Sequence, residues 1–387
     1  MNETLYDTLY KLNSNGSTQV WEIHISENND SYWTVSGKLD GKMTVSAPTM
    51  VTPKQKRTQE EQVTSVCDSK INKKRDKKYV SDVADIHSAS DNLVGYEAML
   101  AHKYDEQKSK INFPCIVQPK LDGIRNLSTI DGFFSRGRKE FTSCTHIREE
   151  LEGFYKADPS ARLDGEFYAH EFKADFEKIC KAVKKSAAKA SPSDLALQQR
   201  VKYYVYDAPR IAGFVETDGF KVRNEELARK LKGLNHIVVV PSIVVTSETD
   251  LLTLKEQWIA DGYEGIMVRN MNSPYEDKRS YNLQKLKDFI DKEFIIVGIN
   301  EGEGALAGHA GSFKFALYDN DADAFIAGLS GDKQHFNAKL VGSRERLKHY
   351  FDNPQEALGK KGTVRYQNLS KDNIPRFPVC QSIRDYE

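Results

Sequence analysis

Short segments in which apolar and polar residues alternate fill the first 55 positions of the chain, around VWEIHI, SYWTVSG and KMTVSA. The turn-forming stretches NSNG, ENND and LDGK separate these segments. Alternation with a period of two is typical of strands that bury one face. The pattern therefore predicts a small antiparallel sheet with tight turns.

The next segment, from Pro53 to about Lys78, is polar and basic. It contains TPKQKRTQEEQ and INKKRDKK, with helix-forming residues between them. Charge runs of this kind are usually solvated. We therefore interpret the segment as a helical or extended linker.

Strand-like and helix-like segments alternate from near Ala98 to about Asp288. The strand-like segments are PCIVQPKL, RLDGEFYAH, KYYVYDAP, IVVVPSIVV and EGIMVR. Apolar residues recur at helical spacing in RNEELARKLKGL, in ETDLLTLKEQWIADG and in the basic stretch ADFEKICKAVKKSAAKA. This organisation predicts a mixed α+β core.

The last part of the chain returns to short strands. EFIIVGINEGEG, GSFKFALYD, KGTVRYQNLS and RFPVCQSIR are separated by turns rich in Gly and Asp, a pattern that favours a small barrel. Because 387 residues exceed the usual size of one hydrophobic core, we expect several domains. The predicted boundaries are 1–90, 91–291 and 292–387.

Composition narrows the class of protein. Hydrophobic residues make up 39% and charged residues 29% of the chain, which is typical of a globular protein and excludes global disorder. No apolar run approaches the roughly 20 residues that cross a bilayer, and the polar start lacks a signal peptide's apolar stretch. We therefore expect no membrane partner and a cytoplasmic location, in the host cytoplasm if the source is viral.

Cysteine usage disfavours two kinds of site, whereas the net charge is uninformative. The five cysteines are scattered and never spaced as CxxC, which disfavours a disulfide framework and a zinc site. Lys plus Arg balance Asp plus Glu at 56 each, so attraction to nucleic acid must come from clustered charge. The net charge itself neither supports nor excludes a nucleic-acid partner.

One segment, VQPKLDGIR, brings Lys120, Asp122, Gly123 and Arg125 together just after a strand. Taken alone, it has a structural interpretation as a solvated strand end whose Asp-Gly pair makes a turn. A nucleophilic lysine needs neighbouring cations or a dry pocket to lose its proton.

Two lysines further along the chain supply such cations. Lys285 and Lys287 in LQKLKDF stand at alternate strand positions, so both can face one site and neutralise phosphate oxygens. A solvated strand face explains the same spacing equally well.

Three more residues fit a nucleotide site. Glu166 in RLDGEFYAH lies in an apolar strand, where a carboxylate needs a hydroxyl, a cation or a metal. Tyr206 in YYVYDAP is placed to stack on a purine, although strand tyrosines more often belong to a core. Glu264 in DGYEGIMVR is a candidate magnesium ligand or a plain surface residue.

Taken in order, KLDGIR, LDGEFY, YYVYD, EGIMVR and LQKLK resemble the nucleotidyltransferase motifs of the ATP-dependent DNA ligase family, especially of small viral ligases. The similarity covers about Ala98 to Glu387 and includes SRGRKEF, EDKRSYNLQKLK and RFPVCQSIR. It implies an adenylation domain of mixed, largely antiparallel sheets with helices, followed by an OB-fold barrel. The expected fold class is therefore α+β, with a small β-rich domain at the N-terminus.

The resemblance implies a three-step reaction. Lys120 attacks the α-phosphate of ATP, AMP passes to the 5′-phosphate of a nick, and the adjacent 3′-hydroxyl displaces AMP. In-line displacements of this kind depend on positioning and charge neutralisation. The implied cofactors are ATP, covalently held as AMP on Lys120, and magnesium, or manganese in its place.

Roles toward the nucleotide follow from the same resemblance. Arg125 and Glu166 would hold the ribose, and Tyr206 would stack on adenine. Gln118 would read the adenine edge through its side chain or backbone. Glu264, together with Glu166, would hold the metal ion.

The resemblance also implies roles toward phosphates and DNA. Arg136 in SRGR and Arg279 in DKRS match positions that grip the 5′-phosphate of the nick, and Asp122 would organise the 3′-hydroxyl side. Lys285 and Lys287 would contact the nucleotide phosphates. The expected partner is nicked duplex DNA, bound by a monomer.

Two parts of the chain depart from the minimal viral pattern. In the final motif, Arg384 and Asp385 are followed by only two residues. The resemblance therefore assigns the pyrophosphate-orienting role to Arg384 only weakly. The N-terminal part resembles a WGR-type module that is expected to bind DNA. Its Trp21 and Trp33 have two interpretations, as surface aromatic residues that contact nucleic acid or as part of the core. In a sheet this small, the core is the more common place for a tryptophan.

Two rival functions remain open. An RNA ligase or a messenger-capping guanylyltransferase shares the lysine chemistry, and a capping enzyme would use GTP. A catalytically idle protein that binds nicks or ends is the second rival. Intact Lys120, Glu166, Glu264, Lys285 and Lys287 argue against it, because decay is expected first at such residues.

Overall fold

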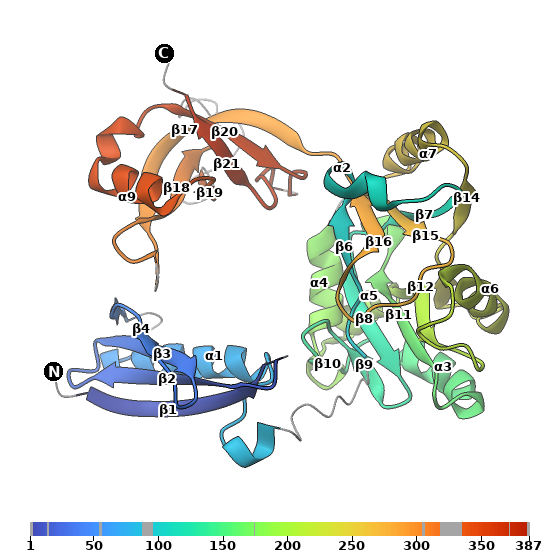
Figure 1. The fold of residues 1–387 in the computed structure, drawn as a ribbon, viewed down its shortest axis with the longest axis horizontal. Coiled ribbons are helices and arrows are strands. Elements are labelled where there is room, and N and C mark those ends of the chain that lie inside the picture. The colour runs from blue at the N-terminus through green and yellow to red at the C-terminus, as the bar shows by residue number, and fades with distance from the viewer. Residues whose placement is uncertain are drawn as a thin grey trace. The chain divides into compact units, whose positions relative to one another are not determined.

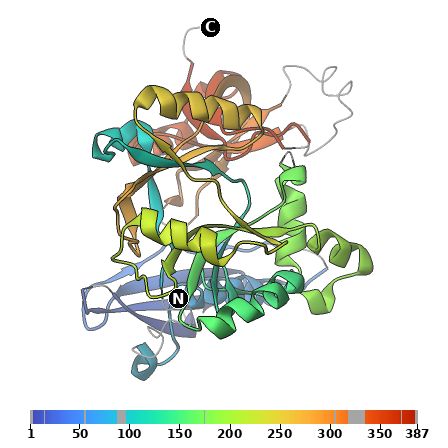
Figure 2. The ribbon, with the colours of Figure 1, turned by 90° about the vertical axis from the view of Figure 1, so that its right-hand side faces the viewer.

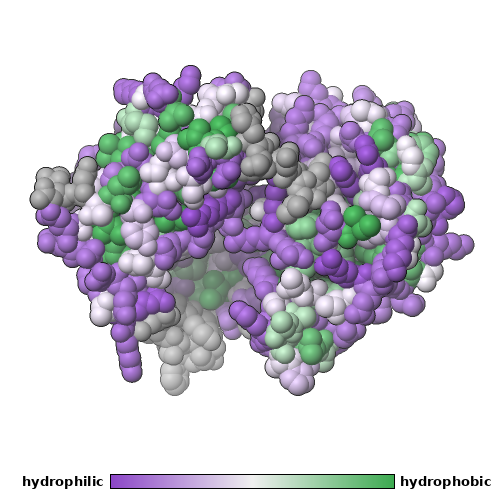
Figure 3. Space-filling view, turned by 90° about the horizontal axis from the view of Figure 1, so that it is seen from below, coloured by the Kyte–Doolittle hydropathy of each residue, from purple (hydrophilic) through white to green (hydrophobic). Residues whose placement is uncertain are grey.

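The computed structural model divides the chain into two compact units, Asn92–Asp288 and Met1–Asp91 with Phe289–Glu387. The residues that the structure describes are 3–13, 15–53, 56–86, 96–173, 175–303, 306–317, 335–370 and 372–384. Among these residues, no helix has the length and apolar character needed to cross a membrane. On the face shown in Figure 3, hydrophilic residues predominate and apolar residues gather only in small groups.

The N-terminal module is the expected antiparallel sheet. Its strands run in the order β1-β2-β3-β4, and β5 pairs with β3. The elements are β1 (Glu3–Leu12), β2 (Thr18–Ser26), β3 (Ser31–Lys38), β4 (Met43–Val45), β5 (Thr49–Met50) and α1 (Gln59–Arg75). Trp21 and Trp33 are 4% and 8% exposed, so the core interpretation of these two residues is confirmed.

The segment 53–78 contains a helix, α1, as one of its two interpretations predicted, but this helix packs on the sheet and belongs to the module (Figure 1). Val63, Cys67 and Ile71 recur every four residues along α1 and lie in one core cluster with residues of the sheet. Thr58 caps the helix, and Glu61 completes a capping box. Because charged residues separate these apolar positions, the sequence pattern did not reveal the buried face of the helix.

The central unit contains two sheets (Figure 1). The six-stranded sheet has the order β10-β9-β8-β11-β12-β13. Its strands are β8 (Ile124–Thr129), β9 (Gly132–Phe134), β10 (Glu140–Phe141), β11 (Arg162–Tyr168), β12 (Lys202–Arg210) and β13 (Ile237–Val239). The five-stranded sheet has the order β14-β7-β15-β16-β6. Its strands are β6 (Leu100–Lys103), β7 (Cys115–Lys120), β14 (Ile243–Val245), β15 (Gly265–Asn270) and β16 (Arg279–Leu286).

Helices cover these two sheets (Figure 2). They are α2 (Tyr104–Gln107), α3 (Thr145–Ala157), α4 (Phe176–Lys184), α5 (Pro192–Gln198), α6 (Phe220–Lys230) and α7 (Glu248–Ala260). Two expectations need correction. The basic helix ends at Lys184, and IVVVPSIVV forms β13 and β14 in different sheets, because Pro241 separates the two apolar runs.

The C-terminal part is a closed barrel with the order β17-β18-β19-β21-β20, an arrangement consistent with the OB-fold. Its elements are β17 (Ile290–Glu301), β18 (Ala310–Ala316), β19 (His335–Leu340), α9 (Arg344–Asp352), β20 (Lys361–Tyr366) and β21 (Val379–Ile383). The sequence pattern did not predict β19 or α9. The predicted fold class, α+β with a barrel and a β-rich N-terminal part, is confirmed.

Candidate active site

The KLDGIR segment passes from one sheet of the central unit to the other. β7 ends at Lys120 in the five-stranded sheet, and β8 begins at Ile124 in the six-stranded sheet. The N–H of Gly123 donates to Glu166 Oε1 at 2.9 Å. A Cβ atom on Gly123 would lie 2.5 Å from the carbonyl oxygen of Phe167, so only glycine allows this close approach.

A cavity of about 270 Å³ opens beside Lys120. Six of its lining residues are Lys or Arg, whereas one is acidic, so the cavity favours an anion. The lining residues are Met99, Leu100, Ala101, Gln118, Pro119, Lys120, Leu121, Arg125, Arg136, Glu166, Tyr206, Met267, Arg269, Arg279, Leu283 and Lys285. Eight of the residues predicted from the sequence are therefore brought together here.

Glu264 lies between two lysine side chains. Its carboxylate accepts a hydrogen bond from Lys120 Nζ and another, at 2.7 Å, from Lys287 Nζ. Its own backbone N–H donates to the carbonyl of Lys120 at 3.0 Å, which keeps the two residues adjacent. Burial opposes ionisation of Glu264, but the two ammonium groups outweigh burial and lower the pKa of the carboxyl.

The same pairing acts on the candidate nucleophile. Burial favours the neutral amine of Lys120, but the carboxylates of Glu264, Glu166 and Asp122 outweigh burial and raise the pKa of the amine. The lysine side chain is 21% exposed and faces the cavity. In the ligand-free protein, Lys120 is therefore an ammonium group at neutral pH.

Lys285 strengthens the positive charge of the site. It lies on β16 and lines the cavity, whereas Lys287 lies just beyond the end of this strand and contacts Glu264. Burial together with the nearby ammonium groups of Lys287 and Lys120 lowers the pKa of Lys285. A group of like charges held this close is stabilised by a polyanion.

Glu166 faces the cavity from the opposite sheet. Burial raises the pKa of its carboxyl to about 7, although Lys120 and the N–H of Gly123 partly offset the effect. A carboxylate in such a position is stabilised by a hydroxyl or cation of a ligand.

Two further residues shape the end of the cavity lined by Tyr206. The side-chain amide of Gln118 donates to the carbonyl of Tyr206 at 3.1 Å and to Ser242 Oγ at 3.0 Å. The Gln118 amide is thereby fixed in orientation. Arg125 lies over the Tyr206 ring, with its guanidinium carbon 5.6 Å from the ring centroid.

Arg125 is held by an ion pair with Asp164. Its Nε donates to Asp164 Oδ1 at 2.9 Å, and its Nη2 donates to Oδ2. Its Nη1 donates to the carbonyl of Met99 at 2.8 Å. Asp164 is fully buried, so this fork-like pairing fixes the guanidinium plane at the cavity wall.

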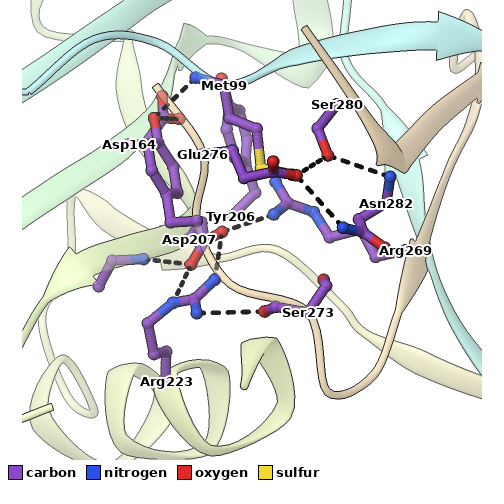
Figure 4. Close-up of polar contacts among 12 residues, drawn as sticks. Met99, Asp164, Tyr206, Asp207, Arg223, Arg269, Ser273, Glu276, Ser280 and Asn282 are labelled. Carbon is purple, nitrogen blue, oxygen red and sulfur yellow. Dashed lines mark hydrogen bonds and ion pairs between the residues drawn. The ribbon is translucent and has the colours of Figure 1, made fainter. Parts of the chain in front are cut away.

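A buried cluster lies behind Tyr206 (Figure 4). Asp207 accepts hydrogen bonds from Arg223 Nε at 3.1 Å and from Arg269 Nη1. Arg223 and Asp207 are 0% exposed, and Arg269 lines the cavity. The cluster therefore ties helix α6 and strand β15 to the strand that carries Tyr206.

The predicted DNA-contacting residues are placed as follows. Arg136 and Arg279 line the cavity, and Arg279 donates to the carbonyl of Ala101. Asp122 lies close enough to Lys120 to act on its pKa. Arg384 belongs to the barrel, where its Nε donates to Glu293 Oε1 at 2.9 Å. Asp385 and residues 318–334 lie outside the described residues.

The donor set limits which metal sites the chain can build. Among the described residues, no group of three or more His, Cys, Asp or Glu side chains is placed to hold a metal ion. Two carboxylates, Glu166 and Glu264, lie near Lys120. One or two carboxylates completed by phosphate oxygens are what magnesium usually takes in nucleotide sites.

Sequence reasoning missed several residues of the site. Met99, Leu100 and Ala101 line the cavity, but they precede every motif and carry no chemical signal. Asp164 and Arg269 stand inside LDGEFY and EGIMVR. A buried charged residue in an apolar strand was the available signal for both, and only Glu166 was singled out on that ground.

Comparison with known proteins decides the family of the central unit. The family model described as the ATP dependent DNA ligase domain matches residues 98–287. These residues form an ATP-dependent DNA ligase domain. The match contains both sheets of the ligase domain and every lining residue of the cavity.

Individual relatives agree with this assignment. A DNA ligase of African swine fever virus is 31% identical over 205 residues, which are 49% of this chain and 45% of the relative. The chain thus spans less than half of that relative's length. A DNA ligase of Haemophilus influenzae is 25% identical over 281 residues, covering 73% of this chain and 90% of the relative.

A solved structure supports the fold beyond the ligase domain. A Lig E DNA ligase structure superimposes with a TM-score of 0.59, at 23% identity, over 74% of this chain and 99% of that chain. At this identity the similarity concerns the fold alone.

Proposed function

We propose that the chain is an ATP-dependent DNA ligase that seals nicks with a 3′-hydroxyl and a 5′-phosphate in duplex DNA. The observation that carries the proposal is the position of Lys120 at a cavity with six cationic lining residues and one acidic residue, inside a DNA ligase domain. Such a cavity suits a triphosphate, whose charge grows on the leaving group during displacement.

The proposed reaction has three displacements. The Lys120 amine bonds to the α-phosphorus of ATP, and pyrophosphate leaves. An oxygen of the DNA 5′-phosphate then bonds to the AMP phosphorus and releases the lysine. Finally the 3′-hydroxyl oxygen bonds to the 5′-phosphorus, and AMP leaves. Lys285 and Lys287 neutralise phosphate oxygens, and Arg136 with Arg279 hold the 5′-phosphate.

Residues around the nucleotide complete the proposal. Tyr206 stacks on adenine, Gln118 lies at its edge, and Arg125 with Glu166 holds the ribose. Glu264 together with Glu166 would hold magnesium, or manganese, which would supply positive charge at the phosphates. Asp122 organises the 3′-hydroxyl side, and Arg384 of the barrel orients pyrophosphate.

The N-terminal module is proposed to contact the DNA backbone. Lys74 Nζ lies 4.9 Å from the centroid of the Trp21 ring, and burial together with Lys77 and Lys11 lowers the pKa of the Lys74 ammonium. Like charges held together on a surface repel one another, and they are stabilised when phosphates neutralise them. We further propose a monomeric, cytoplasmic enzyme, active in the host cytoplasm if the source is viral, that serves replication, repair or recombination.

A nick-sealing assay tests the proposal. A duplex with one nick, labelled at the 5′-phosphate, is incubated with ATP and magnesium, and the product is resolved on a denaturing gel. Sealing of the DNA nick by the wild type and none by Lys120→Arg supports the proposal. Sealing of RNA strands only, or dependence on GTP, favours the RNA ligase or capping enzyme, and binding without sealing favours the idle protein.

A further inference from the structure

The hydroxyl group of Tyr275 lies at the centre of the contacts that fix Arg125. Tyr275 stands between β15 and β16, outside the motifs that led to the site, and is buried. Its hydroxyl donates to Asp164 Oδ2 at 2.7 Å and accepts from the N–H of Met99 at 3.0 Å. Met99 and Asp164 lie side by side in Figure 4.

Two of the three described contacts of this hydroxyl are with groups that hold Arg125, and the third is with the carbonyl of Glu97 at 3.1 Å. Asp164 pairs with Nε and Nη2 of the guanidinium, and the carbonyl of Met99 accepts from Nη1. One hydroxyl therefore links the strand that carries Asp164 to the segment that carries Met99. Removing it leaves each direct contact of Arg125 in place but frees the two supports to move independently.

We propose that Tyr275 is a positioning residue for the nucleotide, because it sets the orientation in which Arg125 meets the ribose of ATP. The inference rests on the proposed function, in which Arg125 contacts that ribose. A guanidinium held in the bound orientation before the ligand arrives loses less freedom on binding. The hydroxyl should therefore affect nucleotide affinity without touching the nucleotide.

The substitution Tyr275→Phe isolates this hydroxyl. The backbone N–H of Tyr275 donates to the carbonyl of Glu216 at 2.7 Å, and the ring packs edge-on against Tyr96 with centroids 6.1 Å apart. Both contacts remain in the variant. Phenylalanine therefore keeps the loop and the packing and removes the contacts of the hydroxyl alone, which are those with Asp164, Met99 and the carbonyl of Glu97.

Tyr203 supplies a matched control. Its hydroxyl is also buried in the ligase domain and donates at 3.0 Å to the backbone carbonyls of Asn126 and Leu163. It donates to neither Asp164 nor Met99 in the described contacts. Tyr203→Phe therefore removes a comparable hydroxyl without removing a contact from the supports of Arg125.

The test measures the Kd of α,β-methylene-ATP by calorimetry, together with the Tm, for the wild type and both variants. We expect Tyr275→Phe to weaken binding by about tenfold, as for loss of a hydrogen bond to a charged group, and Tyr203→Phe to change it by less than about twofold. In an Arg125→Lys background, Tyr275→Phe should cause no further loss, because the guanidinium fork that it supports is already gone.

Two results overturn the inference. One is a Kd of the Tyr275→Phe protein equal to that of the wild type or of the Tyr203→Phe control. The other is a loss that adds in full to that of Arg125→Lys, which indicates a purely structural role. If the wild type forms no lysyl-adenylate from ATP, the proposed function itself has failed, and this separate labelling assay distinguishes that failure.

Discussion

The ammonium group of Lys120 and the carboxylate of Glu264 form a partly buried ion pair in the ligand-free ligase domain. The pair joins the end of β7 to the residue just before β15, and Lys287 contacts the second oxygen of the same carboxylate. A nucleophilic lysine must lose its proton. The ion pair therefore keeps Lys120 protonated in the ligand-free protein, and the proposed reaction requires that this proton is lost.

The first prediction concerns this protonated state. Removing the carboxylate with Glu264→Gln takes away the main group that raises the pKa of Lys120, and burial then favours the neutral amine. We expect the pKa of Lys120 to fall in the ligand-free variant. The measurement is a pH titration of ¹³C-labelled lysine by NMR, assigned with Lys120→Arg. A pKa unchanged from the wild type would show that the pair has no such effect.

The second prediction concerns Glu166, whose pKa burial raises from 4.5 to about 7. The folded state thus binds a proton that the unfolded state releases between these values, so wild-type stability falls as pH rises from 4.5 to 7. Glu166→Gln removes this cost. We expect the variant to gain about 3 kcal/mol at most above pH 7 and almost nothing near pH 4.5.

Urea unfolding of the ligand-free protein at both pH values checks this prediction. The variant should also form less lysyl-adenylate, because the residue is proposed to hold the ribose. An equal gain in stability at both pH values contradicts the assigned cause, since that gain would not depend on ionisation.

The third prediction concerns the cluster behind Tyr206. Asp207→Asn leaves Arg223 and Arg269 buried without a counter-charge, which typically costs about 3–5 kcal/mol. The control is Asp291→Asn, which breaks an exposed pair with Arg365 on the barrel and should cost less than about 1 kcal/mol. Urea unfolding of the two variants and the wild type measures the loss in the free energy of unfolding. Similar small losses in both variants would contradict the assigned importance of the cluster.

The fold could be predicted from the sequence where a periodic pattern was undisturbed. The alternating strands of the module and the four named barrel strands were identified in this way. By contrast, the packing of α1 on the sheet was not predicted, because charged residues surround Val63, Cys67 and Ile71. In the barrel, β19 and α9 carry no motif, so the pattern did not single them out.

The site could be predicted only where a motif concentrated the chemistry. The KLDGIR and LQKLK segments identified Lys120 and Lys285 without any structure. The contact between Tyr275 and Asp164 joins residues 111 positions apart, and no local pattern records such a pairing. Residues that position others are therefore found from the structure, whereas residues that touch the ligand are often visible in the sequence.

The fourth prediction concerns the module. If Lys74 and Lys77 neutralise DNA phosphates, replacing both with Ala should lower the salt dependence of nicked-DNA binding by about one to two counterions. Lys38 and Lys42 are exposed near the turn between β3 and β4 and provide the control pair. Fluorescence anisotropy at several salt concentrations gives the slope. Equal slopes for both double variants would contradict a specific role of the Lys74 surface.

The most direct test of the central claim is covalent labelling of Lys120. The protein is incubated with magnesium and either ATP or GTP radiolabelled at the α-phosphate, then denatured, beside Lys120→Arg. We predict stable label from ATP only, absent from the variant. No label from either nucleotide, or undiminished label in the variant, would contradict the assignment of Lys120 as the adenylated nucleophile.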